Sequence, residues 1–123
     1  MALEKFEFAE QVLGFIISEK IDSKTVHSIH MTINEALLKY ESISLYVEDT
    51  TTGAVDFNAI RKDFTYRIQN NSRYSRIAIV SDKSILSFYT RFKALFMKAE
   101  MRHFSLKNRM EALNWVSAIY TSI

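Results

Sequence analysis

Val12-Leu-Gly-Phe-Ile-Ile17 is the longest apolar stretch of the chain, interrupted only by Gly14. A continuous apolar run of this length is typical of a strand that is buried on both faces of a sheet. A second run of the same kind, Arg76-Ile-Ala-Ile-Val-Ser81, predicts another buried strand much later in the chain. Strands of this kind belong to parallel sheets that are covered by helices, so an α/β fold is predicted.

Strands and helices alternate outward from the first of these runs. Residues 4–8 predict a strand that forms a hairpin with it, and residues 43–47 and 101–104 predict two further strands. Apolar residues that recur every three or four positions predict helices over residues 23–40, 57–69, 83–97 and 106–120. Counted from the second strand, the order is βαβαβαβα. This order implies a mostly parallel sheet of about five strands, packed with four helices.

The composition excludes several classes of enzyme. The 123 residues fit a single domain, 1–123, and its two isolated glycines leave no phosphate-binding loop or dinucleotide fingerprint. The absence of cysteine excludes disulfides, thiol nucleophiles, cysteine-ligated zinc and iron–sulfur clusters. Since no pair of base and nucleophile stands out either, we expect a protein that is not an enzyme and has no cofactor.

Charge and hydropathy indicate the cellular location of the protein and the kind of partner it has. The first residues do not resemble a secretory signal, and no apolar stretch approaches the roughly 20 residues that span a bilayer. We therefore expect a cytoplasmic protein. Acidic residues prevail in residues 1–60 and basic residues in residues 61–123. This polarity is typical of proteins with anionic partners or head-to-tail self-association, while an intermixed solvated surface is the alternative interpretation.

Three segments of the second half resemble a known family. They are Arg76-Ile-Ala-Ile-Val-Ser-Asp-Lys83, Lys93-Ala-Leu-Phe-Met-Lys-Ala-Glu-Met-Arg-His-Phe104 and Glu111-Ala-Leu-Asn-Trp-Val116, and they resemble the SpoIIAA-like family of small bacterial proteins. The predicted order of elements agrees with that family over nearly the whole chain. The resemblance implies a fold related to STAS domains, such as anti-sigma-factor antagonists, and to CRAL-TRIO domains, which carry lipids. It implies binding rather than catalysis.

The helices predicted over residues 57–69 and 83–97 carry the candidate binding residues. The second of them has more apolar side chains than packing on a sheet requires. In the related folds these two helices lie beside a hydrophobic cleft, whose candidate lining residues here are Phe57, Ile60, Phe64, Phe88, Tyr89, Phe92 and Phe96. Such a cleft would take an acyl chain or a flat ligand. The alternative is a closed core that the same rings fill.

Three cations near the second of these helices, Arg91, Lys93 and Lys98, are candidates for contact with an anionic headgroup. The family typically has proline where Lys98 stands, glycine where Ser81 stands and an aromatic residue where Val55 stands. A basic amphipathic helix can rest on an anionic membrane surface. The predicted function is therefore non-catalytic binding of a small hydrophobic or lipid-like molecule, with association of these helices with a membrane. The alternative is a STAS-type regulatory module that holds a protein partner or a second copy.

Polar residues near the predicted strand ends give weaker candidates. We expect Glu48, Asp49, Asp56, Ser81 and Asp82 to gather where ligands of open α/β sheets usually bind, with Asp56 and Asp82 as helix N-caps. The run Asp49-Thr-Thr-Thr-Gly53 is similar to a phosphorylation site of anti-sigma-factor antagonists, but its register favours a surface loop. His27 and His30 lack a third strong metal ligand, so no metal site is predicted. Arg73, Tyr74 and Arg76 are too few to predict nucleic-acid binding.

Overall fold

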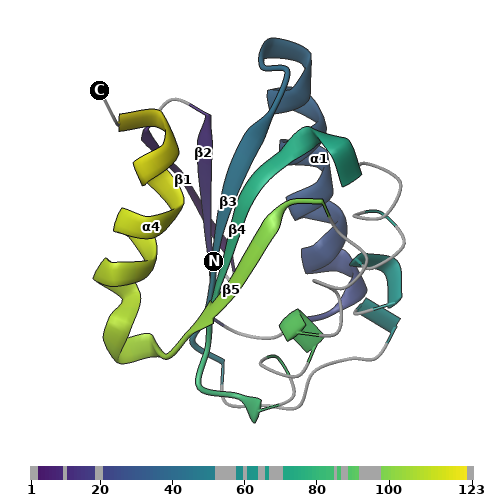
Figure 1. Ribbon diagram of the computed structural model, residues 1–123. Coiled ribbons are helices and arrows are strands. Elements are labelled where there is room, and N and C mark those ends of the chain that lie inside the picture. Colours follow the sequence, from purple (N-terminus) through teal and green to yellow (C-terminus); the bar gives the residue numbers. More distant parts are fainter. Residues whose placement is uncertain are drawn as a thin grey trace.

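Five strands form one mixed sheet in the computed structural model of the chain (Figure 1). The structure describes residues 3–9, 11–18, 21–51, 58, 59, 61–63, 66, 71–84, 86, 89–91 and 98–121. The strands lie side by side in chain order: β1 (Leu3–Ala9), β2 (Val12–Ile17), β3 (Ile43–Asp49), β4 (Tyr74–Val80) and β5 (Glu100–Phe104). β1 is antiparallel to β2, and every other pair of neighbours is parallel. The predicted hairpin and mostly parallel sheet are therefore confirmed.

Helices cover both faces of this sheet. Helix α1 (Ser23–Lys39) lies on one face and α4 (Arg109–Thr121) on the other (Figure 1). Short 3₁₀ turns, η1 (Asn71–Arg73) and η2 (Leu106–Asn108), precede β4 and α4. Residues 58–59, 61–63 and 66, and residues 84, 86 and 89–91, are helical and fall within the other two predicted helices. In the part of the chain described above, no helix has both the length and the apolar character of a membrane span.

The alternation of side chains along each strand builds two separate cores. Ile43 and Leu45 of β3 are fully buried and pack with Ile33 on the α1 face. Tyr46 points the other way and packs with Val116 on the α4 face. Because successive side chains of a strand point to opposite faces, a continuous apolar run supplies both cores at once.

Element boundaries differ from the expected ones at several strand and helix ends. β3 continues to Asp49, and β4 begins at Tyr74, because both positions pair with a neighbouring strand. Asp22 caps α1 and accepts a 2.9 Å hydrogen bond from Thr25 N. The prediction that Asp82 caps the helix after β4 is wrong, since its carboxylate accepts instead from Leu106 N, at 2.9 Å.

Gly14 of β2 provides room for an aromatic ring of the neighbouring strand. Phe6 of β1 lies directly opposite Gly14, and a Cβ atom added to Gly14 would overlap the ring. The ring is also tilted against Tyr46, with 5.9 Å between centroids. Phe6 thus covers the glycine and joins the core on the α4 face.

Gly14→Ala is therefore expected to lower the free energy of unfolding by about 1–3 kcal/mol, because the Phe6 ring must leave its place. Urea denaturation of the purified protein measures this change. Phe6→Leu in the same chain should recover part of the loss, since the smaller side chain leaves room for the new methyl group. Equal stability of Gly14→Ala and the wild type would show that the ring does not depend on the glycine.

Candidate functional site

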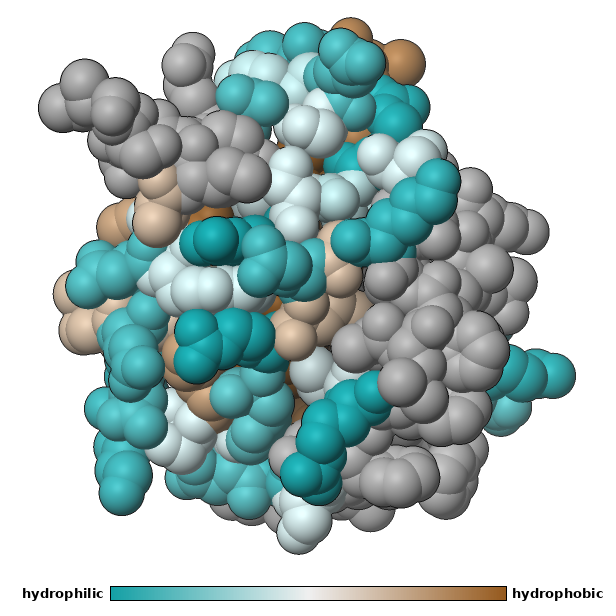
Figure 2. All heavy atoms as spheres, viewed as in Figure 1, coloured by the Kyte–Doolittle hydropathy of each residue, from teal (hydrophilic) through white to brown (hydrophobic). Residues whose placement is uncertain are grey.

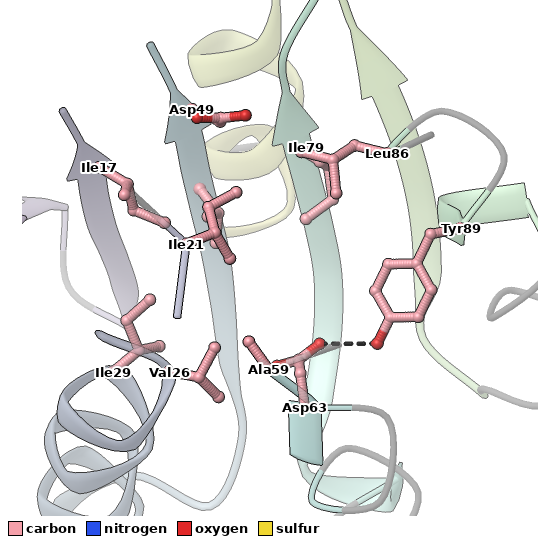
Figure 3. A pocket seen from close by; sticks show the side chains of 11 residues that line it. Ile17, Ile21, Val26, Ile29, Asp49, Ala59, Asp63, Ile79, Leu86 and Tyr89 are labelled. Atoms are coloured by element: carbon pink, nitrogen blue, oxygen red, sulfur yellow. Dashed lines mark hydrogen bonds between the residues drawn. The ribbon is translucent and has the colours of Figure 1, made fainter. Parts of the chain in front are cut away.

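A pocket opens at the carboxyl ends of the parallel strands, under α1 and the helical residues of segments 58–63 and 84–91 (Figure 3). Its volume is about 70 Å³. Apolar side chains dominate its lining, which includes Ile17, Ile21, Val26, Ile29, Val47, Ala59, Ile79 and Leu86. Three polar residues, Asp49, Asp63 and Tyr89, complete the described lining. The pocket can therefore accept a small apolar group beside a few hydrogen-bonding atoms.

Asp63 joins three segments at one side of this pocket. Its Oδ2 accepts a 2.9 Å hydrogen bond from the Tyr89 hydroxyl (Figure 3), and its Oδ1 lies 3.2 Å from Nε2 of His30 in α1. The His30 ring is stacked on Tyr66, with 3.9 Å between centroids, and the Tyr66 hydroxyl donates to the side chain of Asn34. These contacts tie α1 to the two segments that cover the pocket.

Asp49 lies at another side, where β3 and β4 end. It is 3% exposed, and its Oδ2 lies 2.8 Å from the Lys83 ammonium. Its Oδ1 accepts from the Thr51 amide at 2.9 Å and from the Thr51 hydroxyl at 2.6 Å, while Ser81 Oγ donates to Oδ2 at 3.3 Å. A carboxylate with an ammonium and three other donors has its charge compensated in place. These contacts therefore hold the Asp49 carboxylate in place at the edge of the pocket.

Glu48 does not join Asp49, although both were expected at one site. It is the preceding residue of the same strand, so its side chain points to the α4 face. There its Oε1 accepts a 2.5 Å hydrogen bond from the Tyr46 hydroxyl, and its Oε2 lies 3.5 Å from Nη2 of Arg109. Among the five expected residues, only Asp49 and Ser81 are in contact, Asp82 points to Leu106, and Asp56 lies outside the described residues.

The Tyr46–Glu48 pair should make stability depend on alkaline pH. Burial of the Tyr46 hydroxyl, followed by its hydrogen bond to Glu48, raises the pKa of Tyr46 above its ordinary value. In the unfolded chain a tyrosine ionises near pH 10, roughly. Above that pH the unfolded state loses a proton that the folded state keeps, so the stability present at lower pH falls as the pH rises.

Tyr46→Phe should make the free energy of unfolding fall less steeply between about pH 10 and 12, because the variant lacks this hydroxyl. At neutral pH the same change should lower the free energy of unfolding by about 1 kcal/mol, because Glu48 loses a donor. Urea midpoints measured across that range test the expectation. Tyr40→Phe is the matched control and should keep the wild-type slope. A Tyr46→Phe slope equal to that of the wild type would contradict the assignment.

The structure describes three of the ten candidate site residues. Tyr89 lines the pocket, and Arg91 and Lys98 are exposed. The other predicted cleft residues, Phe57, Ile60, Phe64, Phe88, Phe92 and Phe96, lie outside the described residues, as does Lys93. The predicted cleft therefore stays a prediction for those rings. The sequence indicated only the two predicted helices, whereas the pocket is also lined by residues of α1 and of the strand ends.

Two contacts of the pocket have no local signal in the sequence. His30 and Asp63 are 33 residues apart, and Asp49 and Lys83 are 34 residues apart, so only the crossover topology brings each pair together. His103 has its Nε2 2.7 Å from the carbonyl oxygen of Ser81. That contact holds β5 against the end of β4.

The cations considered for nucleic-acid binding are engaged within the chain. Arg73 donates to three main-chain carbonyls near the end of α1, and Arg76 lies 4.9 Å from the Trp115 ring centroid while donating to its carbonyl at 2.7 Å. Arg102 lies 5.3 Å from the same ring. The space-filling view shows hydrophilic residues over much of the side where α4 lies, with apolar residues between them (Figure 2).

The mixed five-stranded sheet, with α4 on one face, α1 on the other and a pocket at the strand ends, defines the chain as an α/β protein. Residues 12–117 match the model of the family described as SpoIIAA-like, and the chain belongs to that family.

One solved structure with the same fold is an uncharacterized protein of the DUF3478 family from Shewanella loihica PV-4, described as having a SpoIIAA-like fold. It is 16% identical, the match covers 94% of each chain, and the TM-score is 0.70. No curated protein matches the chain. At this identity the likeness establishes the fold alone, while the match to the family model confirms the family that the sequence resembles.

Proposed function

We propose that the protein is a non-catalytic binding module that takes the apolar part of a small hydrophobic or lipid-like molecule into the pocket under α1 and segments 58–63 and 84–91. The observation that carries the proposal is the described part of the pocket lining, which consists of eight apolar and three polar residues. Apolar walls with a few placed polar groups are the usual composition of a ligand site. The SpoIIAA-like fold is compatible with such a role, since the sequence resemblance relates this family to STAS-type binding modules.

The size of the pocket limits what can enter it. Sites for drug-sized ligands typically measure about 300–1,000 Å³, whereas this pocket measures about 70 Å³. Only a short run of methylene groups or part of a ring fits. A longer chain would require the covering segments to move away from α1, and the Asp63 contacts with His30 and Tyr89 oppose that movement.

The charges around the pocket orient the ligand. Asp49 and Asp63 face the pocket, so an anionic headgroup inside it would meet two carboxylates. Outside, Arg91 is an exposed cation two positions after Tyr89, whereas Lys98 precedes β5 and lies at the amino ends of the strands, away from the pocket. The ligand would therefore insert its apolar end and leave an anionic head near Arg91, which also suits contact with an anionic membrane surface.

Two measurements test the proposal together. Native mass spectrometry of freshly purified protein should show a bound molecule that Ala59→Leu removes, because the larger side chain fills the pocket. Phosphatidylglycerol vesicles should sediment with the protein more than phosphatidylcholine vesicles do, and Arg91→Glu should weaken that binding. Val47→Leu is a milder filling variant if Ala59→Leu does not fold, and Ala118→Leu, on the opposite face, is the matched control. Absence of both a bound molecule and vesicle binding would contradict the proposal.

The family relationship favours a second candidate, a STAS-type module that binds a protein partner. A partner held by the charged surface should dissociate as salt rises, because screening weakens contacts between exposed charges. Binding of an apolar ligand should persist at high salt. Pull-down and size-exclusion measurements at low and high salt therefore separate the two candidates.

A further inference from the structure

The outer edge of β1 is the surface from which we draw a further inference. β1 lies at one end of the sheet, and β2 is its one strand neighbour within the described residues. Its side chains at Lys5, Glu7 and Phe8 are exposed, and Phe8 keeps 45% of its surface accessible. An exposed strand edge presents a row of backbone donors and acceptors that another strand can pair with.

The charges on this edge are free to act between molecules. Lys5 and Glu7 point to the same face, because they are two positions apart in a strand. Neither forms an ion pair or hydrogen bond through its side chain with another residue in the described segments. At the opposite edge of the sheet, by contrast, Glu100 of β5 lies 3.5 Å from Arg76, and Arg102 lies over the Phe104 and Trp115 rings. β1 is therefore the edge whose charges have no partner among the residues that the structure describes.

We propose that a second copy of the chain pairs with β1 in antiparallel orientation, around a twofold axis at Phe6. Residues that lie directly opposite each other in an antiparallel pair point to the same face of the sheet. A twofold axis perpendicular to the sheet meets this condition only when it passes between one residue and the same residue of the second copy. An axis at Phe6 sets Lys5 opposite Glu7 of the second copy, twice. An axis at Lys5 sets two lysines opposite each other, and an axis at Glu7 sets two glutamates opposite each other. Only the register centred on Phe6 pairs opposite charges.

The other face of the same register brings aromatic rings together. Phe6 would stand opposite Phe6 of the second copy. Directly opposite residues of antiparallel strands have Cβ atoms about 4.5–5.5 Å apart, so the two rings would be in reach of each other. Phe6 is already fixed by Gly14 and Tyr46. The two Phe6 rings would thus meet on the α4 face, while the ion pairs form on the α1 face.

A lysine on an edge strand often prevents edge-to-edge association. Here Lys5 disfavours the register centred on Lys5, in which two lysines are opposite each other. It favours the register centred on Phe6, in which it lies opposite Glu7. The two charges therefore select one arrangement. An interface of a single strand pair is small, and small interfaces give weak or transient complexes.

Sedimentation velocity over a wide range of protein concentration tests the pairing. The wild type should show a concentration-dependent dimer. Lys5→Glu and Glu7→Lys should each raise the dimer dissociation constant about tenfold or more, because each variant sets like charges opposite each other. The double variant Lys5→Glu/Glu7→Lys should associate like the wild type. An equal mixture of the two single variants should also associate, since every charge then meets its opposite.

Matched controls are Lys24→Glu on α1 and Glu111→Lys on α4, which make the same charge changes at exposed positions away from the edge. They should associate like the wild type, and circular dichroism shows that each variant is folded. A wild type that is monomeric at every concentration would overturn the proposal. So would single variants that dimerise as well as the wild type, or a mixture that associates no better than its components.

Discussion

Lys83→Met is expected to lower the free energy of unfolding by about 3 kcal/mol, the largest effect that we expect for a single side chain outside the apolar cores. The substitution keeps most of the volume of the side chain and removes its charge. Asp49 would then stay buried with only hydroxyl and amide donors from Thr51 and Ser81. Removing one partner of a buried ion pair is costly because the remaining charge is left uncompensated.

Urea denaturation measures this loss, with Lys107→Met, at an exposed lysine, as the matched control. The double variant Asp49→Asn/Lys83→Met should recover a substantial part of the stability, since no buried charge remains. Lys83→Met within about 0.5 kcal/mol of the wild type would show that the Asp49 charge does not depend on the ion pair.

Arg73→Ala should lower the free energy of unfolding by about 2 kcal/mol. Its Nε donates to the carbonyl of Glu41 at 2.6 Å, and its Nη2 donates to the carbonyls of Leu37 and Tyr40 at 2.9 and 3.1 Å. The last carbonyls of a helix have no partner within the helix, so the guanidinium satisfies groups that would otherwise lack donors. It also fastens the end of α1 to the start of β4.

Arg73→Lys should recover less than half of that loss, because an ammonium cannot reproduce the planar arrangement of guanidinium donors. Arg61→Ala, at an exposed arginine, is the control and should change stability little. Thermal or urea unfolding of the four proteins measures the series. Full recovery by lysine would mean that charge alone, rather than the geometry of three hydrogen bonds, stabilises this junction.

The sequence allowed the order of elements to be predicted because each element has a local cause. Val12–Ile17 and the residues of β4 form apolar runs, and α1 has both an apolar stripe and the Asp22 cap. These signals depend on neighbours within a few positions, so they survive without knowledge of the fold. Strand ends were less predictable, since pairing with a neighbouring strand extends β3 to Asp49.

The site was harder to predict because it depends on contacts between distant segments. Adjacent Glu48 and Asp49 look like one acidic pair in the sequence, yet the strand sends them to opposite faces. Lys83 has no sequence neighbour that marks it as the partner of Asp49, and the crossover brings the two together. Asp63 was not singled out at all, although it links His30 and Tyr89 at the pocket. Only the folded arrangement gives these residues their partners.

The central claim is that the pocket takes an apolar group, and an NMR titration with octanoic acid tests it most directly. The account predicts saturable shifts of the amide signals of Ile17, Val47 and Ile79, which line the pocket from three strands. Ala59→Leu should abolish these shifts, and Ala118→Leu should leave them unchanged. Shifts that are absent, that do not saturate, or that survive Ala59→Leu in a folded protein would contradict the claim.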